Sequence, residues 1–112
     1  MSLDIKLQPE TLRSLAFGSI GAAYAGIGTA LDEPSRMLII QNLTDAALLF
    51  SFDGVNDHLI LNTEVSLVMD VTTNKSSVQG LYFSAGTRIY VKRSGVPTSG
   101  SVYVSSFYGS GV

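Results

Sequence analysis

The sequence predicts an all-β fold. Short apolar runs alternate with turn signals rich in Gly, Asn, Asp and Ser about every 8–12 residues, which is typical of all-β proteins. After Leu15 no helical periodicity persists, and no segment has the pattern of a crossover helix between parallel strands. We therefore expect a two-sheet antiparallel β-sandwich of jelly-roll type, with a short N-terminal arm.

We expect about seven to nine short strands in this sandwich. The segments with strand patterns are residues 19–27, 35–41, 46–52, 58–61, 65–71, 80–84, 87–92 and 101–108. Residues 35–41 contain the continuous apolar run Met-Leu-Ile-Ile, which indicates a central strand covered on both faces. In residues 101–108 we expect Val102, Val104 and Phe107 to point inward.

The chain divides by pattern into an N-terminal arm or lead-in, residues 1–14, and a single β-sandwich domain, residues 15–112. The arm mixes charges without a clear period, and Pro9 favours one helical turn over residues 9–13. Residues 15–31 carry no charge, but they are shorter than a membrane span and follow a leader that is not basic. We expect them to be Gly- and Ala-rich strands.

Composition excludes several function classes. The 112 residues contain 7 Lys and Arg against 9 Asp and Glu, a net charge of −2, so the basic footprint of a nucleic-acid-binding protein is missing. The chain has no Cys and 1 His, which excludes disulfides and clusters of His or Cys metal ligands. Charged residues are only 14%, and a weakly charged, hydroxyl-rich surface favours association. The composition suggests a subunit of an assembly.

One segment, residues 53–58 (Asp-Gly-Val-Asn-Asp-His), admits three interpretations. Asp57 and His58 could act as an acid–base pair, although neighbours on a strand point to opposite faces. Asp53, Asn56 and Asp57 could hold a weak cation, although the spacing of a calcium loop is absent. The interpretation we favour is a hairpin turn stabilised by Asx hydrogen bonds. We assign no catalytic, cofactor-binding or metal-binding residue.

Aromatic and basic side chains supply the candidate interface. Four tyrosines could line one sheet face and stack on a sugar, or they could form cross-strand pairs and interface contacts; they are Tyr82, Tyr90, Tyr103 and Tyr108. A small basic group lies near the end of one strand and could meet a partner's carboxylates or protect a strand edge. From these groups we select Tyr90, Tyr103, Arg88 and Lys92 as interface residues. An exposed edge strand or the Gly/Ala-rich segment 18–28 is a further possible contact.

The middle and end of the chain resemble small virion structural proteins of tailed bacteriophages. The resemblance covers residues 35–108 and is carried by turn and strand patterns, namely SFDGVNDH, DVTTNK, GTRIYVK and GSVYV. The group it suggests is the jelly-roll capsid decoration, or staple, proteins. These motifs are not catalytic signatures, so the resemblance transfers no catalytic residue.

The resemblance implies a non-enzymatic structural role on the phage particle. The expected partner is the major coat protein of the phage, bound from outside by a homodimer, without cofactor, nucleic acid or membrane. The protein would be made in the bacterial host cytoplasm and end in the virion. A head–tail connector or tail adaptor subunit is the alternative within the class, and a carbohydrate-binding jelly-roll module is the alternative outside it.

Overall fold

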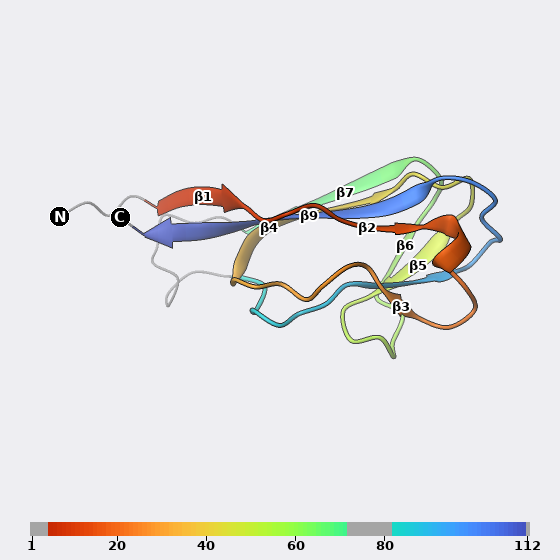
Figure 1. Cartoon of the computed structure of the whole chain (residues 1–112), viewed down its shortest axis with the longest axis horizontal. Helices are drawn as coiled ribbons and strands as arrows, with labels where there is room; N and C mark the ends of the chain where they lie inside the picture. Colours follow the sequence, from red (N-terminus) through yellow and green to blue (C-terminus); the bar gives the residue numbers. More distant parts are fainter. Residues whose placement is uncertain (1–4, 72–81, 112) are drawn as a thin grey trace.

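Two antiparallel sheets face one another in the computed structural model, which describes residues 5–71 and 82–111 (Figure 1). The five-stranded sheet contains β1 (Ile5–Pro9), β2 (Arg13–Ala16), β4 (Ser35–Asn42), β7 (Val65–Asp70) and β9 (Ser101–Gly111). The four-stranded sheet contains β3 (Ala25–Gly26), β5 (Leu48–Ser51), β6 (Leu59–Leu61) and β8 (Tyr90–Arg93). The prediction of an all-β, two-sheet antiparallel architecture is confirmed.

Strand order places the longest strand near the centre of the larger sheet. The order is β1-β9-β4-β7, with β2 also paired to β9, and the smaller sheet has the order β3-β8-β5-β6. One 3₁₀ turn, Phe17–Ser19, is the helical element of the described residues. No helix within the described ranges is long and apolar enough to cross a membrane.

Both sheets contribute alternate side chains to one core. β4 and β9 bury every second residue, while β5 and β8 bury theirs from the opposite side. The buried apolar side chains are Ile20, Ile27, Leu31, Leu38, Ile40, Leu48, Phe50, Leu61, Ile89, Val91, Val102 and Val104. Because inward and outward residues alternate, each strand also presents a fixed set of side chains outside the sandwich.

β4 is a central strand, as predicted, but the chain fully covers only one of its faces. Leu38 and Ile40 are buried, whereas Met37 and Ile39 on the other face are half-buried. The expected cover on both faces is therefore wrong for this chain alone. β9 also differs, because Ser106 points inward and Phe107 points to the outer face with Tyr103.

The N-terminal segment is part of the larger sheet. β1 pairs with the end of β9, from Ile5↔Gly111 to Pro9↔Phe107, and β2 pairs with its beginning, from Arg13↔Val104 to Ala16↔Ser101. The helical turn expected over residues 9–13 is wrong, since the chain only steps from one strand to the next there. Residues 5–9 lie along β9 at one end of the molecule's long axis (Figure 1).

A buried ion pair fixes this step between β1 and β2. The Arg13 guanidinium donates to Glu10 Oε1 at 2.8 Å, and both side chains are 6% exposed. Arg13 also donates to Ser106 Oγ at 2.9 Å and to the carbonyl oxygens of Thr29 at 2.7 Å and Ala30 at 2.9 Å. One side chain thereby connects β2, β9 and the loop that leads to β4.

Glu10 completes the cluster from the other side. Its carboxylate accepts the Glu33 amide at 2.9 Å and the Ser106 hydroxyl at 3.1 Å, in addition to Arg13. Burial alone would raise the pKa of Glu10, but these hydrogen bonds hold its pKa below the ordinary value. The ionised carboxylate is therefore the form that fits the fold.

Several of the predicted strand segments are shorter or differently placed than expected. The predicted strand 87–92 is observed as β8, Tyr90–Arg93, and the predicted strand 46–52 as β5, Leu48–Ser51. Of residues 19–27, only Ala25 and Gly26 form a strand, β3, after the 3₁₀ turn. Within β3 the backbone of Gly26 approaches Arg88 closely, because a Cβ there would lie 2.1 Å from the Arg88 guanidinium carbon. Residues 80 and 81 of the predicted strand 80–84 lie outside the described residues, and Phe83 forms an isolated bridge with Ser35.

Replacing Arg13 by Ala should lower the free energy of unfolding by about 3–5 kcal/mol. The substitution leaves the Glu10 carboxylate buried without its cation, the situation in which breaking a buried pair is costly. Urea denaturation of the Arg13→Ala chain would measure this loss. Lys6→Ala, an exposed cation on β1, is the matched control and should change stability by less than about 0.5 kcal/mol. A loss equal to that of Lys6→Ala would contradict the role given to Arg13.

The stability of the chain should also depend on pH through Glu10. Because its folded pKa lies below the ordinary value near 4.5, its contribution is complete above that pH and is lost as the pH falls through the folded pKa. Urea denaturation of the wild-type chain and of the Glu10→Gln chain at several pH values from about 7 to about 3 would test this. That range covers both the ionised and the protonated carboxyl. The wild type should lose more stability on acidification than the variant, and parallel pH curves would contradict the assignment.

Candidate interaction surface

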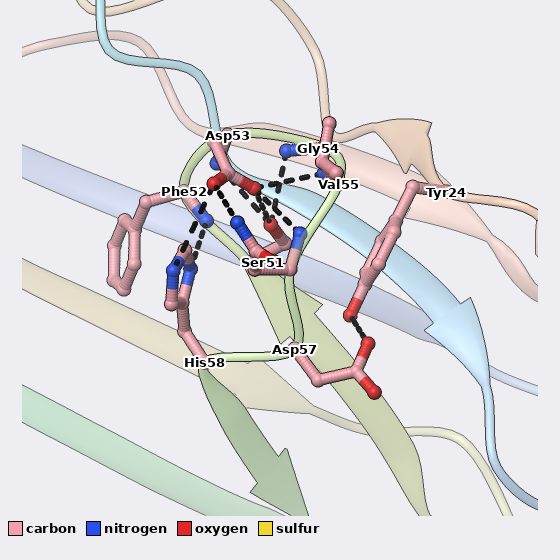
Figure 2. A network of polar contacts seen from close by, with 9 residues as sticks. Tyr24, Ser51, Phe52, Asp53, Gly54, Val55, Asp57 and His58 are labelled. Carbon is pink, nitrogen blue, oxygen red and sulfur yellow. Dashed lines mark hydrogen bonds and ion pairs between the residues drawn. The ribbon is translucent and has the colours of Figure 1, made fainter.

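The loop after β5 is organised by the Asp53 carboxylate (Figure 2). Asp53 Oδ1 accepts the backbone amides of Val55 and Asn56, each at 2.8 Å, and the Ser51 hydroxyl at 2.8 Å. Asp53 Oδ2 accepts the Asn56 side-chain amide at 2.9 Å. Gly54 has φ +77°, which a residue with a side chain rarely adopts, and the Tyr90 ring packs beneath it.

This arrangement defines what Asp53 can do chemically. The backbone hydrogen bond from Asn56, followed by those from Val55, the Asn56 side chain and Ser51, lowers the pKa of Asp53 well below its ordinary value. Its oxygens face N–H and O–H donors, an environment that suits an anion within a turn and not a cation ligand. The described residues contain no group of three or more His, Asp or Glu side chains placed to hold a metal ion. The geometry is that of the Asx-stabilised turn.

Asp57 and His58 point away from each other, as Figure 2 shows. His58 Nδ1 accepts the Phe52 amide at 3.0 Å, and Asp57 accepts the Tyr24 hydroxyl and an ion pair from Lys92 at 3.1 Å. The two side chains therefore do not form an acid–base pair. His58 instead closes the loop on itself at Phe52, and Asp57 connects the loop to Tyr24 and Lys92.

Lys92, one of the selected interface residues, is engaged within the chain. Besides the ion pair with Asp57, its Nζ lies 4.7 Å from the centroid of the Tyr24 ring, within the range of a cation–π contact. Burial raises the pKa of Tyr24, and the hydrogen bond to Asp57 raises it further. Tyr24 was not predicted to take part in any site. From this region the sequence analysis selected Lys92, and the partners of Lys92 within the chain appear only in the structure.

Arg88 is likewise held by its own chain. Its Nε donates to the Gly28 carbonyl oxygen at 2.8 Å, and its guanidinium carbon lies 5.7 Å from the Tyr90 ring centroid. The guanidinium occupies the space that a side chain at position 26 would fill. Part of the Gly/Ala-rich segment considered as a contact for a partner therefore serves an internal contact with Arg88.

The structure separates the four selected interface residues. Tyr90 and Lys92 alternate with buried Val91 and point outward from the four-stranded sheet, close to Arg88. Tyr103 alternates with buried Val102 and points outward from the five-stranded sheet. Tyr103 therefore lies on the opposite side of the sandwich from the other members of the selected group.

The four tyrosines considered for sugar stacking do not share one sheet face. Tyr82 lies outside the named strands, and Tyr90 and Tyr103 lie on opposite outer faces. Tyr108 lies beside Pro9 and Glu33, where it lines an open cavity of about 280 Å³. The single aromatic platform that sugar stacking requires is not assembled from these residues.

The larger surface feature is the outer face of the five-stranded sheet. Paired residues of antiparallel strands share a face, so the register assigns a continuous set of side chains to it. We call this set the outer sheet face: Met37, Ile39, Gln41, Ser66, Val68, Asp70, Tyr103, Ser105 and Phe107. Asp70, beside Met37 at the end of β7, is the one charged side chain of this set, and Val68 is 57% exposed.

A sequence signal for this surface exists, although we interpreted it differently. The continuous run Met37–Ile40 predicts cover on both faces of its strand, and the chain itself covers only one. On the remaining face, Met37 and Ile39 stay half-buried.

Comparison of the chain with protein-family models, with curated proteins and with solved structures finds no match. The candidate surface is therefore interpreted from its own geometry and chemistry.

Replacing Asp53 by Ala should open the loop without unfolding the sandwich. The amides of Val55 and Asn56 lose their acceptor, so their hydrogen exchange should become faster, while the amides of Leu48 and Phe50 in β5 stay protected. Asp32→Ala removes an exposed acid elsewhere and should leave all four amides unchanged. Unaltered exchange at Val55 and Asn56 in the Asp53→Ala chain would contradict the turn assignment.

Proposed function

We propose that this chain is a structural protein of a tailed-phage particle. The specific role proposed is a non-enzymatic capsid decoration, or staple, protein of jelly-roll type that binds the outer shell as a homodimer. The resemblance of residues 35–108 to that group supports the class. The two-sheet sandwich is compatible with a jelly roll.

One observation carries the proposal: a sheet face with a single charged side chain, Asp70, whose central strand has apolar side chains outward. Depletion of charge with exposed apolar and aromatic side chains characterises the core of protein interfaces. On the outer sheet face, Ile39 lies beside Val68 in the register, and Phe107 lies beside Met37. We propose that this face, with Tyr103, docks on the coat protein.

The face that carries Tyr90, Arg88 and Lys92 is a less favourable docking surface for the coat protein. The basic side chains there already have partners within the chain, namely Asp57 for Lys92 and the Gly28 carbonyl for Arg88. Their use by a partner would break those contacts first, so part of the binding free energy would be lost. Tyr103 is therefore the selected interface residue on which the proposal depends.

The mechanism of such a protein is mechanical and thermodynamic. A rigid sandwich that contacts neighbouring coat subunits must detach before those subunits separate. Binding that favours the assembled shell over its broken state shifts that equilibrium by mass action. Linking two binding faces in one dimer raises the effective concentration of the second contact and slows release.

The test is the number of copies that bind to purified capsids from which the protein has been removed. The recombinant chain is added, the particles are pelleted, and copies per coat subunit are counted. A copy number comparable to that of the coat protein supports the shell role. Copies limited to one ring per particle would overturn it in favour of a connector or tail adaptor, and no binding would overturn it in favour of the carbohydrate-binding alternative, tested next with a glycan array.

A matched pair of variants locates the docking face. Tyr103→Ser should weaken capsid binding by about tenfold or more, because an aromatic side chain at the centre of an interface typically contributes over 1 kcal/mol. Tyr90→Ser makes the same chemical change on the opposite face and should leave capsid affinity within about twofold. Circular dichroism would confirm that both chains are folded. If Tyr90→Ser weakened capsid binding more than Tyr103→Ser did, the docking face would be the one that carries Tyr90.

A further inference from the structure

The loop after β5 contains a chemically reactive pair of residues, Asp53 and Gly54, which the proposed function does not use. A glycine after an aspartate lets its backbone nitrogen approach the aspartate side chain, because glycine has no Cβ to hinder that approach. This is the one Asp-Gly pair in the sequence, which has no Asn-Gly pair. The Asp53 side chain is 44% exposed, so solvent water has access to it.

The reaction open to this pair is isomerisation of the aspartate through a cyclic imide. The Gly54 nitrogen forms a bond to Asp53 Cγ and loses its proton, while the carboxyl group loses its hydroxyl, so a water molecule leaves. Water then opens the ring at either of its carbonyl carbons. Opening at Cγ restores aspartate, whereas opening at the backbone carbonyl carbon gives isoaspartate, in which the main chain runs through Cγ. The reaction consumes and releases only water.

One buried hydroxyl in the structure holds both reacting groups (Figure 2). The Gly54 amide donates to Ser51 Oγ at 2.9 Å, and the Ser51 hydroxyl donates in turn to Asp53 Oδ1 at 2.8 Å. Ser51 is completely buried at the end of β5, and its oxygen also accepts the Asp53 amide at 3.2 Å. The side chain that holds the attacking nitrogen is therefore the one that holds the carboxylate under attack.

The remaining hydrogen bonds of Asp53 oppose ring closure from the side of the carboxylate. The backbone amides of Val55 and Asn56 donate to Oδ1, and the Asn56 side chain donates to Oδ2. Any rotation that turns Cγ toward the Gly54 nitrogen must break bonds of this set. The same bonds hold the pKa of Asp53 well below its ordinary value, and an ionised carboxylate is a poorer electrophile than a carboxylic acid.

We propose that Asp53–Gly54 is an isomerisation site that becomes reactive when the loop opens, and that the Ser51 hydroxyl protects it in the folded chain. Isoaspartate lengthens the main chain by one carbon and moves the carboxylate to a different carbon, so the original turn cannot form again. The modification therefore starts from the opened or unfolded chain and leaves the loop open afterwards. This inference concerns how long the fold stays intact and does not depend on the proposed function.

The first test compares isoaspartate formation in the folded and the unfolded wild-type chain. Samples with and without guanidinium chloride are incubated at the same pH and temperature, and peptide mapping by mass spectrometry measures isoaspartate at position 53. The unfolded chain should react at least about tenfold faster, which corresponds to a free energy of local opening of about 1.4 kcal/mol. Similar rates in both samples, or no isoaspartate in either, would overturn the proposal.

A matched pair of serine variants tests the role of Ser51. In the folded state Ser51→Ala should form isoaspartate about fivefold faster than the wild type, the factor expected for one lost hydrogen bond. Ser35→Ala removes an equally buried hydroxyl on β4, whose bond to the Glu33 carbonyl oxygen is long at 3.4 Å, and should react within about twofold of the wild type. Equal rates in two folded variants would contradict the role of Ser51.

Hydrogen exchange of the wild type tests the same role without a substitution. The Gly54 amide should exchange more slowly than in the unfolded chain, although it belongs to a surface loop, because Ser51 Oγ holds it. Exchange at Gly54 as fast as in the unfolded chain would show that the hydroxyl does not hold the attacking nitrogen, and would overturn the proposal even if Ser51→Ala failed to fold.

Discussion

The Arg13–Glu10 ion pair is the interaction on which the connection between the N-terminal strands and the rest of the sandwich depends. Arg13 reaches a carboxylate before β2, a hydroxyl on β9 and two carbonyl groups of the loop before β4. Few other side chains could satisfy these acceptors together, since only guanidinium presents several donors in one rigid plane. A buried charge of this kind is tolerated because it is fully hydrogen-bonded, and in return it fixes where the chain crosses from β1 to β2.

Several other charged side chains are also engaged in contacts within the chain. Arg88 lies against Gly26, Lys92 pairs with Asp57, and Asp45 accepts the Thr98 and Ser99 amides at 2.7 and 3.3 Å. These contacts hold loops to the smaller sheet and to each other. The outer sheet face has one charged side chain, Asp70 at the end of β7, and is otherwise uncharged, which is why that surface, and not the polar loop at Asp53, is the candidate for assembly.

The outer sheet face follows from the residue pattern of one strand. It arises because β4 has apolar residues at every position from Met37 to Ile40, while the smaller sheet covers only alternate ones. Beside β4, β7 adds Val68 and Ser66 to this face and ends in its one charged residue, Asp70.

Local pattern predicted β4, β5, β6, β7 and β9, the turn at Asp53 and the core of β4, β5, β8 and β9, because alternation and Asx turns depend on neighbouring residues. It did not predict β1 and β2, which become strands by pairing with the distant β9. It could not place Phe107 outward, since the inward position belongs to Ser106, whose hydroxyl bonds to Arg13 and Glu10. Nor could it show that Tyr90 and Tyr103 lie on opposite faces, or that Arg88 occupies the space beside Gly26. Those outcomes depend on which strands become neighbours, since Gly28 and Arg88, 60 positions apart, meet only where β3 pairs with β8.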